Sequence, residues 1–495
     1  MIKANTNPHD LARELSGFHF IHGKLVSAQS GETFGVLNPA TGTDIGRAAA
    51  GDAADVNIAV KSAVGAQKEW AKKNARERGK LIAECGRLLS EHVEELGRLV
   101  ALESGKALRT ESRVEASILA DTFVYFGGLA SEIKGETIPY NTSSLTMTIR
   151  EPIGVVGAII PWNVPMYLMA LKIAPALVAG NSVVVKSAEE APLCCLRVCQ
   201  LINQILPPGV FNILSGDGPV CGGPVAAHPD VAKVTFTGSV ETGRIIYRAA
   251  AEKLIPVTLE LGGKSPMLIM ADADLDQAIG GALTGMRFTR QGQSCTAASR
   301  IFVHRSIHDE FVERLSAAVD AMIMGDPLDE QTDIGTIISP GQFERVNHYL
   351  GLAESIPGAK LRACSAMPTN PELASGLFVR PVIITGVDND SVVCREEIFG
   401  PVTCVIPFDE PDDAIEQAND TIYGLAATVW TSDLRFAMRA VNELEAGFVQ
   451  VNQNVVVQPM LPYGGYKQSG IGKEASLDAM LEHFTHRKTI IINMT

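Results

Sequence analysis

From residue 154 onward, short apolar runs alternate with segments of helical periodicity, and this rhythm constrains the fold more than any other feature. Residues 154–160 and 182–186 are predicted to be buried strands. Residues 165–178 are predicted to be the helix between them, which Pro175 must end or kink. Apolar strands separated by helices are typical of a parallel sheet covered on both faces. The same rhythm predicts a helix over 191–205, a strand over 231–235 and a helix over 241–251.

Other parts of the chain extend this α/β architecture. Residues 75–103 carry a wide apolar stripe at helical spacing, and Gly105 follows as a stop signal. A second α/β stretch covers residues 261–465. Two isolated β-rich segments, 145–150 and 489–493, lie outside both stretches. We expect these two segments to pair with each other or across subunits.

Composition excludes two classes of partner. A length of 495 residues suffices for two or three domains. The net charge of −14 argues against nucleic acid, whose binding requires basic surfaces. Residues 166–180, the most apolar long stretch, are short for a membrane span and contain Lys172 and Pro175, and residues 1–20 lack the apolar core of a secretory signal. We therefore expect a cytoplasmic protein with neither nucleic acid nor membrane as partner.

Cys295 differs from the other cysteines of the chain. The nine cysteines are odd in number and lack the spacing of a disulfide framework or a zinc site, so we predict neither disulfides nor a metal. Small and polar residues flank Cys295 from Gly292 to Thr296. Such a loop gives a nucleophile access and places backbone N–H groups nearby. From the local sequence alone, a buried core cysteine remains the alternative.

Two further side chains supply the groups that a reactive thiol requires. Glu260 ends an apolar run, 255–259, where a carboxylate is costly unless it is paired or works with a raised pKa. A salt bridge or a helix cap is the alternative for Glu260. Asn163 offers an amide donor. A thiolate that attacks a carbonyl, a donor for the oxyanion and a carboxylate that activates water are the parts needed to oxidise an aldehyde through a thioester.

Two strand ends could hold a nucleotide. Residues 236–243, which include Gly238 and Ser239, follow a strand and open a helix whose N-terminus can hold a phosphate. Glu189 follows the strand that ends at Lys186, and a carboxylate there can bind ribose hydroxyls and disfavours a 2′-phosphate. The standard Gly-x-Gly-x-x-Gly fingerprint does not occur in the expected strand–helix context, so each signal alone is weak.

Seven motifs in a fixed order resemble the aldehyde dehydrogenase superfamily, over nearly the whole chain from about residue 36. A chance match to all seven is negligible. The motifs are Pro161-Trp162-Asn163, Lys186-Ser187-Ala188-Glu189, Phe236-Thr237-Gly238-Ser239, Leu259-Glu260-Leu261-Gly262-Gly263, Gly292-Gln293-Ser294-Cys295, Glu396-Glu397-Ile398-Phe399-Gly400-Pro401 and Pro462-Tyr463-Gly464-Gly465-Tyr466-Lys467.

The resemblance implies a role for each motif. Cys295 is the nucleophile, Asn163 and the backbone N–H of Cys295 form the oxyanion hole, and Glu260 is the general base for hydrolysis. Lys172 and Glu474 match positions implicated in proton relay. NAD is the implied cofactor, bound by Ile159, Pro161, Trp162, Lys186, Ser187, Glu189, Gly238, Ser239, Leu261, Glu397 and Phe399.

The resemblance also implies three structural units and self-association. An NAD-binding domain comprises residues 1–131 and 153–261, a catalytic domain residues 262–470, and a small β oligomerisation arm residues 132–152 and 471–495. The expected fold class is α/β, with two parallel or mixed open sheets, the first Rossmann-like. Because the isolated strands fall in the arm, a homodimer or homotetramer is implied.

The implied substrate is a small-molecule aldehyde held in a tunnel without a cationic residue. A distal carboxylate usually requires Arg or Lys, and a quaternary ammonium requires an aromatic or acidic cage. We therefore predict NAD-dependent oxidation of an uncharged aliphatic or aromatic aldehyde to the carboxylic acid. A CoA-acylating semialdehyde dehydrogenase and a non-catalytic NAD-binding relative are the alternatives, which the presence of Glu260 and Cys295 disfavours. The predicted tunnel residues are Val164, Tyr167, Leu168, Leu171, Thr289, Ser294, Thr296, Val455 and Val457.

Overall fold

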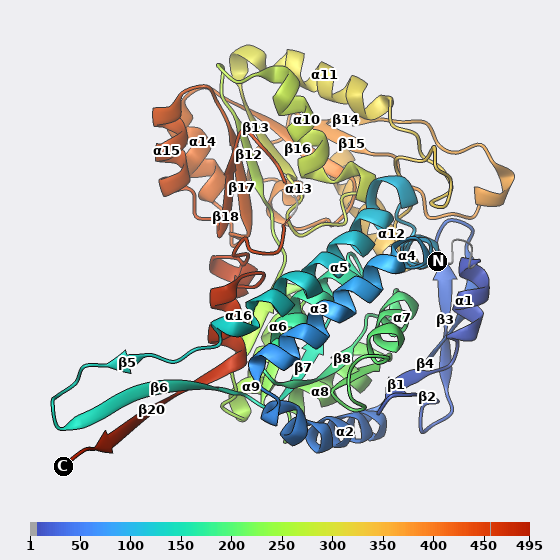
Figure 1. Ribbon diagram of the computed structural model, residues 1–495. Coiled ribbons are helices and arrows are strands. Elements are labelled where there is room, and N and C mark those ends of the chain that lie inside the picture. Colours follow the sequence, from blue (N-terminus) through green and yellow to red (C-terminus); the bar gives the residue numbers. More distant parts are fainter. Residues whose placement is uncertain (1–6, 456) are drawn as a thin grey trace.

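The chain forms two α/β lobes and a projecting β arm, as a computed structural model that describes residues 7–455 and 457–495 shows (Figure 1). Residues 1–6 of the predicted NAD-binding domain lie outside the described residues. The fold class predicted from the sequence, α/β with parallel and mixed sheets, is confirmed. Among the described helices, none is long and apolar enough to cross a membrane.

The first lobe is built on a sheet of eight strands in the described residues, in the order β19-β11-β10-β7-β8-β9-β1-β2. Its central strands pair in parallel, so their carboxyl ends meet at one edge. Ile159, Lys186 and Glu260, the last residues of three of these strands, therefore lie at the same edge. The strands are β1 (His19–Ile21), β2 (Lys24–Val26), β7 (Val155–Ile159), β8 (Ser182–Lys186), β9 (Phe211–Leu214), β10 (Lys233–Thr237), β11 (Val257–Glu260) and β19 (Gly470–Ile471).

Helices α6 and α9 connect strands of this sheet as the sequence predicts. Pro175 lies in the last turn of α6, and the helix runs on to Val178, so the proline does not end it at once. Proline has no N–H, so α6 lacks the backbone hydrogen bond from residue 175, but the helix continues because the N–H of Ala179 still donates to the carbonyl of Pro175 at 3.0 Å. The longer helices of the lobe are α2 (Ala53–Lys72), α3 (Ala75–Glu91), α4 (Val93–Ser104), α5 (Arg113–Gly128), α6 (Pro165–Val178), α7 (Pro192–Ile202) and α9 (Val240–Glu252).

The helical periodicity over 75–103 is confirmed, but the structure divides this stretch into two helices. The chain leaves helical geometry at His92, with φ −111° and ψ 13°, between α3 and α4. The apolar stripe continues across the break, which is why periodicity alone does not locate it. Gly105 ends α4 in a left-handed conformation with φ 73°, as predicted.

The second lobe is built on the sheet β14-β15-β16-β13-β12-β17-β18, in which all neighbours pair in parallel except β14 with β15. Helices lie around this sheet in Figure 1. The strands are β12 (Pro266–Ile269), β13 (Arg300–His304), β14 (Lys360–Ala363), β15 (Val382–Thr385), β16 (Val402–Phe408), β17 (Ala426–Trp430) and β18 (Phe448–Val451). The longer helices are α10 (Leu275–Met286), α11 (His308–Asp320), α12 (Pro340–Glu354), α14 (Pro411–Asn419) and α15 (Leu434–Glu443).

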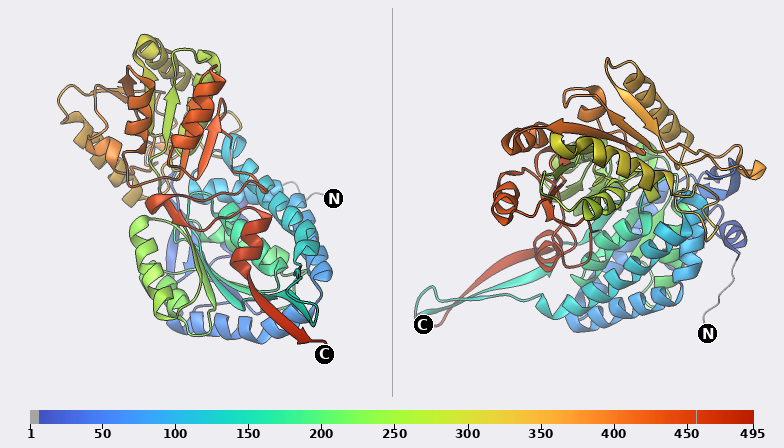
Figure 2. Two further views of the ribbon diagram at one scale, coloured as in Figure 1. Left: turned by 90° about the vertical axis from the view of Figure 1, so that its left-hand side faces the viewer. Right: turned by 90° about the horizontal axis from the view of Figure 1, so that it is seen from above.

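The arm is an antiparallel ribbon that projects from the first lobe (Figures 1 and 2). Strand β20 (Thr485–Asn493) pairs with β6 (Ser144–Pro152) along its whole length, and β5 (Thr137–Ile138) pairs with β6. The two isolated strands predicted from the sequence thus pair with each other. The division into three units by residue range stays a prediction. Within the predicted arm segment 471–495, α16 (Leu477–Phe484) packs against α6 of the first lobe rather than in the ribbon.

Candidate active site

Two cavities meet at Cys295 and Asn163, which line both of them. One cavity has a volume of about 440 Å³ and runs between α5, α6 and the loop before Cys295. The other has a volume of about 530 Å³ and follows the loops after β7, β10 and β11 to Glu397 and Phe399. A side chain at this junction can react with molecules held in either cavity, so we take the junction as the candidate active site.

Cys295 is half-buried, and its Sγ lies 3.3 Å from the hydroxyl oxygen of Tyr463. Burial raises the pKa of the Cys295 thiol to about 11, the Tyr463 hydroxyl opposes this rise, and the charges of Glu397 and Glu260 add to it.

A tight turn at Gly292 precedes Cys295 in the chain. Gly292 has φ +63°, and a methyl group there would lie 2.0 Å from the carbonyl oxygen of Gly400, so the turn requires glycine.

Asn163 is held in place through its side chain and its backbone. Its side-chain Nδ2 donates to the carbonyl of Gln293 at 3.2 Å, and its backbone carbonyl accepts from Lys106 Nζ at 2.9 Å. Lys106 also forms a buried ion pair with Glu115, whose Oε1 accepts from the backbone N–H of Met166 at 2.8 Å. This pair fixes the segment between β7 and α6, which positions Asn163 beside the thiol.

Glu260 is 3% exposed, and neither oxygen of its carboxyl group has a hydrogen-bond partner among the described residues. The salt bridge or cap that was its alternative is not found in the described part of the chain. Burial raises the pKa of Glu260 well above its usual range, the charge of Glu474 adds to the rise, and Lys172 opposes it. Glu260 lines neither cavity, but a methyl group at Gly464 would lie 2.8 Å from its Oε1, which places this oxygen beside the residue that follows Tyr463.

Lys172 and Glu474, the predicted relay residues, are brought together beneath the site. Lys172 Nζ on α6 donates to Glu474 Oε1 at 2.6 Å, and Thr235 Oγ1 donates to the same oxygen at 3.2 Å. Lys172 is 0% and Glu474 4% exposed. The charges of both residues act on the pKa of Glu260, which places the pair near that carboxyl group, although neither residue is hydrogen-bonded to it within the described part of the chain.

Most of the predicted cofactor residues line the larger cavity. Ser239 is the N-cap of α9, where its Oγ accepts from the backbone N–H of Thr242 at 3.2 Å. Glu397 Oε1 accepts from the backbone N–H of Gly263 at 2.9 Å, and burial raises the pKa of Glu397 to about 7. The ring of Phe399 meets that of Trp162 edge to face at 5.2 Å. The predicted residues that line the cavity are Pro161, Trp162, Gly238, Ser239, Leu261, Glu397 and Phe399.

Four predicted cofactor residues lie outside the bounds of that cavity, namely Ile159, Lys186, Ser187 and Glu189. Lys186 Nζ pairs with Glu189 Oε2 at 2.8 Å, and the Ser187 hydroxyl donates to the carbonyl of Leu214 at 3.2 Å. A methyl group at Gly222 would lie 3.8 Å from Lys186 Cδ and 3.9 Å from Ile159 Cδ1. These residues gather at the carboxyl ends of β7 and β8.

The smaller cavity differs from the predicted tunnel in two ways. Val455 does not line it and is instead 42% exposed beside a separate hollow of about 10 Å³. Arg287 and Arg290 do line it, together with Glu111 and Glu115, so the prediction of a tunnel without cationic residues is wrong. The predicted residues that line it are Val164, Tyr167, Leu168, Leu171, Thr289, Ser294, Thr296 and Val457.

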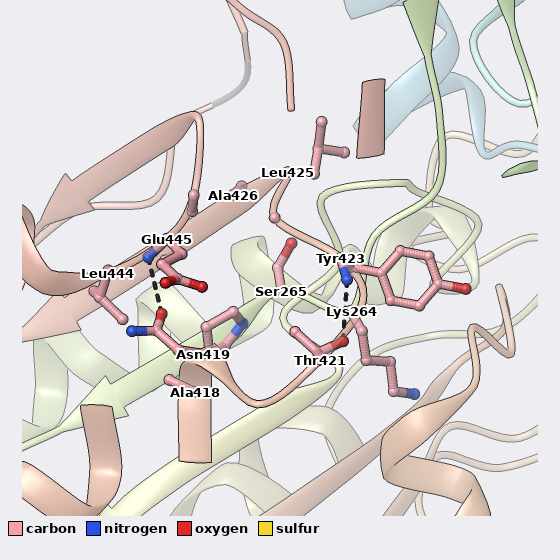
Figure 3. A pocket seen from close by; sticks show the side chains of 14 residues that line it. Lys264, Ser265, Ala418, Asn419, Thr421, Tyr423, Leu425, Ala426, Leu444 and Glu445 are labelled. Atoms are coloured by element: carbon pink, nitrogen blue, oxygen red, sulfur yellow. Dashed lines mark hydrogen bonds between the residues drawn. The ribbon is translucent and has the colours of Figure 1, made fainter. Parts of the chain in front are cut away.

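A further small hollow, on the second lobe beside Lys264, Thr421 and Tyr423, is shown in Figure 3. Its volume is about 10 Å³, which is enough for a water molecule but not for an organic substrate. Neither Cys295 nor Glu260 lines it, so it does not compete with the junction as the active site.

Comparisons with known proteins agree with this geometry. Residues 25–490 match the profile of the aldehyde dehydrogenase family. The chain belongs to this family. Betaine aldehyde dehydrogenases from Rhizobium etli and Rhizobium leguminosarum bv. trifolii are 41% identical over 483 residues, which are 96% of this chain and 97% of theirs.

Solved structures of aldehyde dehydrogenases have the same fold. The NAD⁺ complex of the Bacillus cereus enzyme has a TM-score of 0.95 and 38% identity, covering 99% of each chain. Betaine aldehyde dehydrogenase from Staphylococcus aureus in complex with NAD⁺ has a TM-score of 0.95 and 36% identity, covering 99% of this chain and 97% of that one.

In this aldehyde dehydrogenase, several residues of the site were not assigned roles from the sequence. Tyr463 belongs to the motif Pro462–Lys467, but its position beside the thiol is known only from its contact with Cys295, 168 residues away. Lys106 and Glu115 form no recognisable motif in the sequence. Arg287 follows a helical pattern, so no sequence signal distinguishes it from a surface arginine at the end of that helix.

Proposed function

We propose that this enzyme oxidises an aldehyde to the carboxylic acid through a thioester on Cys295, with NAD as the hydride acceptor. The single observation that supports this most is that Cys295 and Asn163 line both cavities. An aldehyde in the smaller cavity and a nicotinamide in the larger one would then meet at the same sulfur. Family membership and the NAD⁺ complexes of the relatives agree with the proposal.

The first step is attack of the Cys295 thiolate on the aldehyde carbon, which forms a C–S bond and leaves negative charge on the oxygen. Asn163 Nδ2 and the backbone N–H of Cys295 donate hydrogen bonds to that oxyanion. The buried Lys106–Glu115 pair keeps Asn163 in position for this role. A nicotinamide held in the larger cavity would supply the hydride acceptor, and loss of hydride from the carbon bound to Cys295 converts the adduct into a thioester.

Hydrolysis releases the acid, and Glu260 is the base for it. Its raised pKa makes its carboxylate a stronger base than an exposed one, and it lacks a partner that would compete for a water molecule within the described residues. The carboxylate removes a proton from water as the oxygen attacks the thioester carbon, and the thiol leaves. The buried Lys172–Glu474 pair, whose charges act on the pKa of Glu260, is the candidate acceptor for this proton.

The larger cavity fits a dinucleotide by its donor set. The N-terminus of α9 at Ser239 suits a phosphate, and Glu397, beside the small residues Gly262 and Gly263, suits ribose hydroxyls. A methyl group at Gly262 would lie 2.2 Å from Glu397 Oε2, so glycine there makes room for the carboxylate. Glu189, three residues after β8, would repel a 2′-phosphate, which its partner Lys186 offsets in part, and so favours NAD over NADP.

The apolar side chains of the smaller cavity support an aliphatic or aromatic body for the aldehyde. The prediction that the substrate is uncharged rested on a tunnel without cationic residues. Because Arg287 and Arg290 line the cavity, that premise does not hold. Betaine aldehyde, the substrate in the names of the Rhizobium relatives, is disfavoured because an aromatic cage for its ammonium would consist of Tyr167 and Tyr463 alone, with no tryptophan among the described residues of the lining. Both carboxylates of the lining, Glu111 and Glu115, are already paired with cations.

NADH formation in the absence of CoA tests the proposed function. A panel of aliphatic and aromatic aldehydes should yield NADH with NAD alone, followed at 340 nm. The kcat/KM for NADP should be lower than for NAD because of Glu189. NADH formation that depends on CoA would instead support the acylating alternative. The absence of NADH with every aldehyde would support the non-catalytic alternative.

The arm supports the proposal of a homodimer or homotetramer. Ile491 is 62% and Met494 66% exposed, which is costly for apolar side chains unless another subunit covers them. Strand β20 lies at the edge of its sheet and can pair with a further strand. Sedimentation velocity should give at least twice the mass of one chain, and Ile491→Asp should lower it. The exposed Lys24→Glu on β2 is the control, and a monomeric wild type would contradict the proposal.

A further inference from the structure

The charges that line the smaller cavity do not balance. Arg290 donates through Nε to Glu111 Oε2 at 2.9 Å, and Thr289 Oγ1 donates to Glu111 Oε1 at 2.5 Å. Arg290 Nη2 bonds to the same Oε2, so the guanidinium and the carboxylate neutralise each other. Arg290 is therefore engaged within the wall of the cavity and is not available to a ligand.

The second carboxylate of the lining is engaged in the same way. Glu115 pairs with Lys106, and both side chains are at most 3% exposed. The other oxygen of Glu115 accepts from the backbone N–H groups of Met166 and Tyr167 at the start of α6. Glu115 thus contributes no free negative charge to the cavity.

Arg287 is the charge that remains. It lines the cavity and is 8% exposed, yet its guanidinium has no hydrogen bond or ion pair with any residue in the described ranges 7–455 and 457–495. The side chain follows α10, where the backbone of Arg287 is left-handed, with φ 57° and ψ 45°. Burying an unpaired charge is costly, and burial lowers the pKa of Arg287, but a guanidinium stays protonated.

We propose that Arg287 binds a carboxylate carried by the substrate, so that the enzyme acts on aldehydes that also bear a carboxylate. This inference rests on the proposed function, because it assumes that the aldehyde occupies the cavity beside Cys295. A planar guanidinium matches a carboxylate with two parallel hydrogen bonds and supplies the one unpaired charge of the lining. Leu168, Leu171 and Ile118 would contact the apolar body between the two groups. A quaternary ammonium would be repelled by the same residue.

A pair of aldehydes of one shape and two charges tests this proposal. 4-Formylbenzoate and 4-formylbenzamide differ in the charge of the group opposite the aldehyde. For the wild type, kcat/KM should be higher for the benzoate. In Arg287→Gln, kcat/KM for the benzoate should fall about 10- to 100-fold, while that for the benzamide stays within about threefold. Arg287→Lys should recover part of the loss, because it keeps the charge but not the planar fork.

Two controls separate this inference from the proposed function. Arg248→Gln removes an exposed positive charge on α9 and should leave both values of kcat/KM unchanged. Calorimetric titration of Cys295→Ala with 4-formylbenzoate measures binding without reaction, and Arg287→Gln in that background should abolish the binding. Wild-type oxidation of the benzamide at least as efficiently as the benzoate would overturn the role of Arg287 and leave the proposed function intact. Failure to oxidise either aldehyde, or any other, would overturn both.

Discussion

Replacing Cys295 by alanine should reduce NADH formation at least about 10⁴-fold, because no other group at the junction of the two cavities can form the thioester. Tyr463, whose hydroxyl oxygen lies 3.3 Å from the sulfur, has a pKa that burial raises well above its usual range, so its hydroxyl is not a substitute nucleophile. The measurement is the absorbance of NADH at 340 nm with saturating NAD and the best aldehyde of the panel. Cys199→Ala, in the buried face of α7, is the matched control and should keep its activity.

The raised pKa of the Cys295 thiol gives this prediction a second readout. Only the thiolate is alkylated, so inactivation of the wild type by iodoacetamide should accelerate as the pH rises toward about 11. We expect NAD to shift this profile to lower pH by changing the surroundings of the thiol. Cys295→Ala should still bind NAD, which shows that it is folded. NADH formation within tenfold of the wild type in this variant would contradict the thioester mechanism.

The sheets could be predicted from the sequence because their strands are continuous apolar runs. Strand β8 coincides with the predicted range 182–186, where every residue is buried. The break at His92 could not be predicted, because apolar residues at helical spacing continue on both sides of it. Its cause is the local backbone conformation, which the spacing of apolar residues does not encode.

The reactive groups of the site were predictable, whereas their supports were not. Cys295, Glu260 and Asn163 lie in motifs whose residue types the chemistry requires. The role proposed for Arg287 could not be predicted in this way. It depends on which charged side chains of the cavity wall form ion pairs in the folded chain. Glu111, the partner of Arg290, comes from η1 (Leu108–Ser112), 179 residues upstream in the chain. Such a balance of charge is a property of the packed structure and not of any short segment.

Replacing Glu260 by glutamine should separate the two halves of the reaction. Formation of the thioester requires the thiol, the oxyanion donors and the nicotinamide but not this carboxylate, so the first turnover should proceed. Hydrolysis requires the base, so steady-state turnover should fall about 10²- to 10⁴-fold. Stopped-flow absorbance at 340 nm should therefore show a burst of about one NADH per active site followed by a slow phase.

The pH dependence of thioester hydrolysis gives a second test of Glu260 as the general base. Glu260 acts as a base only when deprotonated, and its pKa is raised by burial, so hydrolysis in the wild type should become faster as the pH rises through that pKa. The glutamine variant should lose this limb of the profile. Glu252→Gln, at the exposed end of α9, is the control for loss of a carboxylate and should keep both the rate and the limb. If the burst disappeared together with the slow phase, Glu260 would be acting before the thioester forms, for instance by deprotonating Cys295, and its assignment to hydrolysis would be wrong.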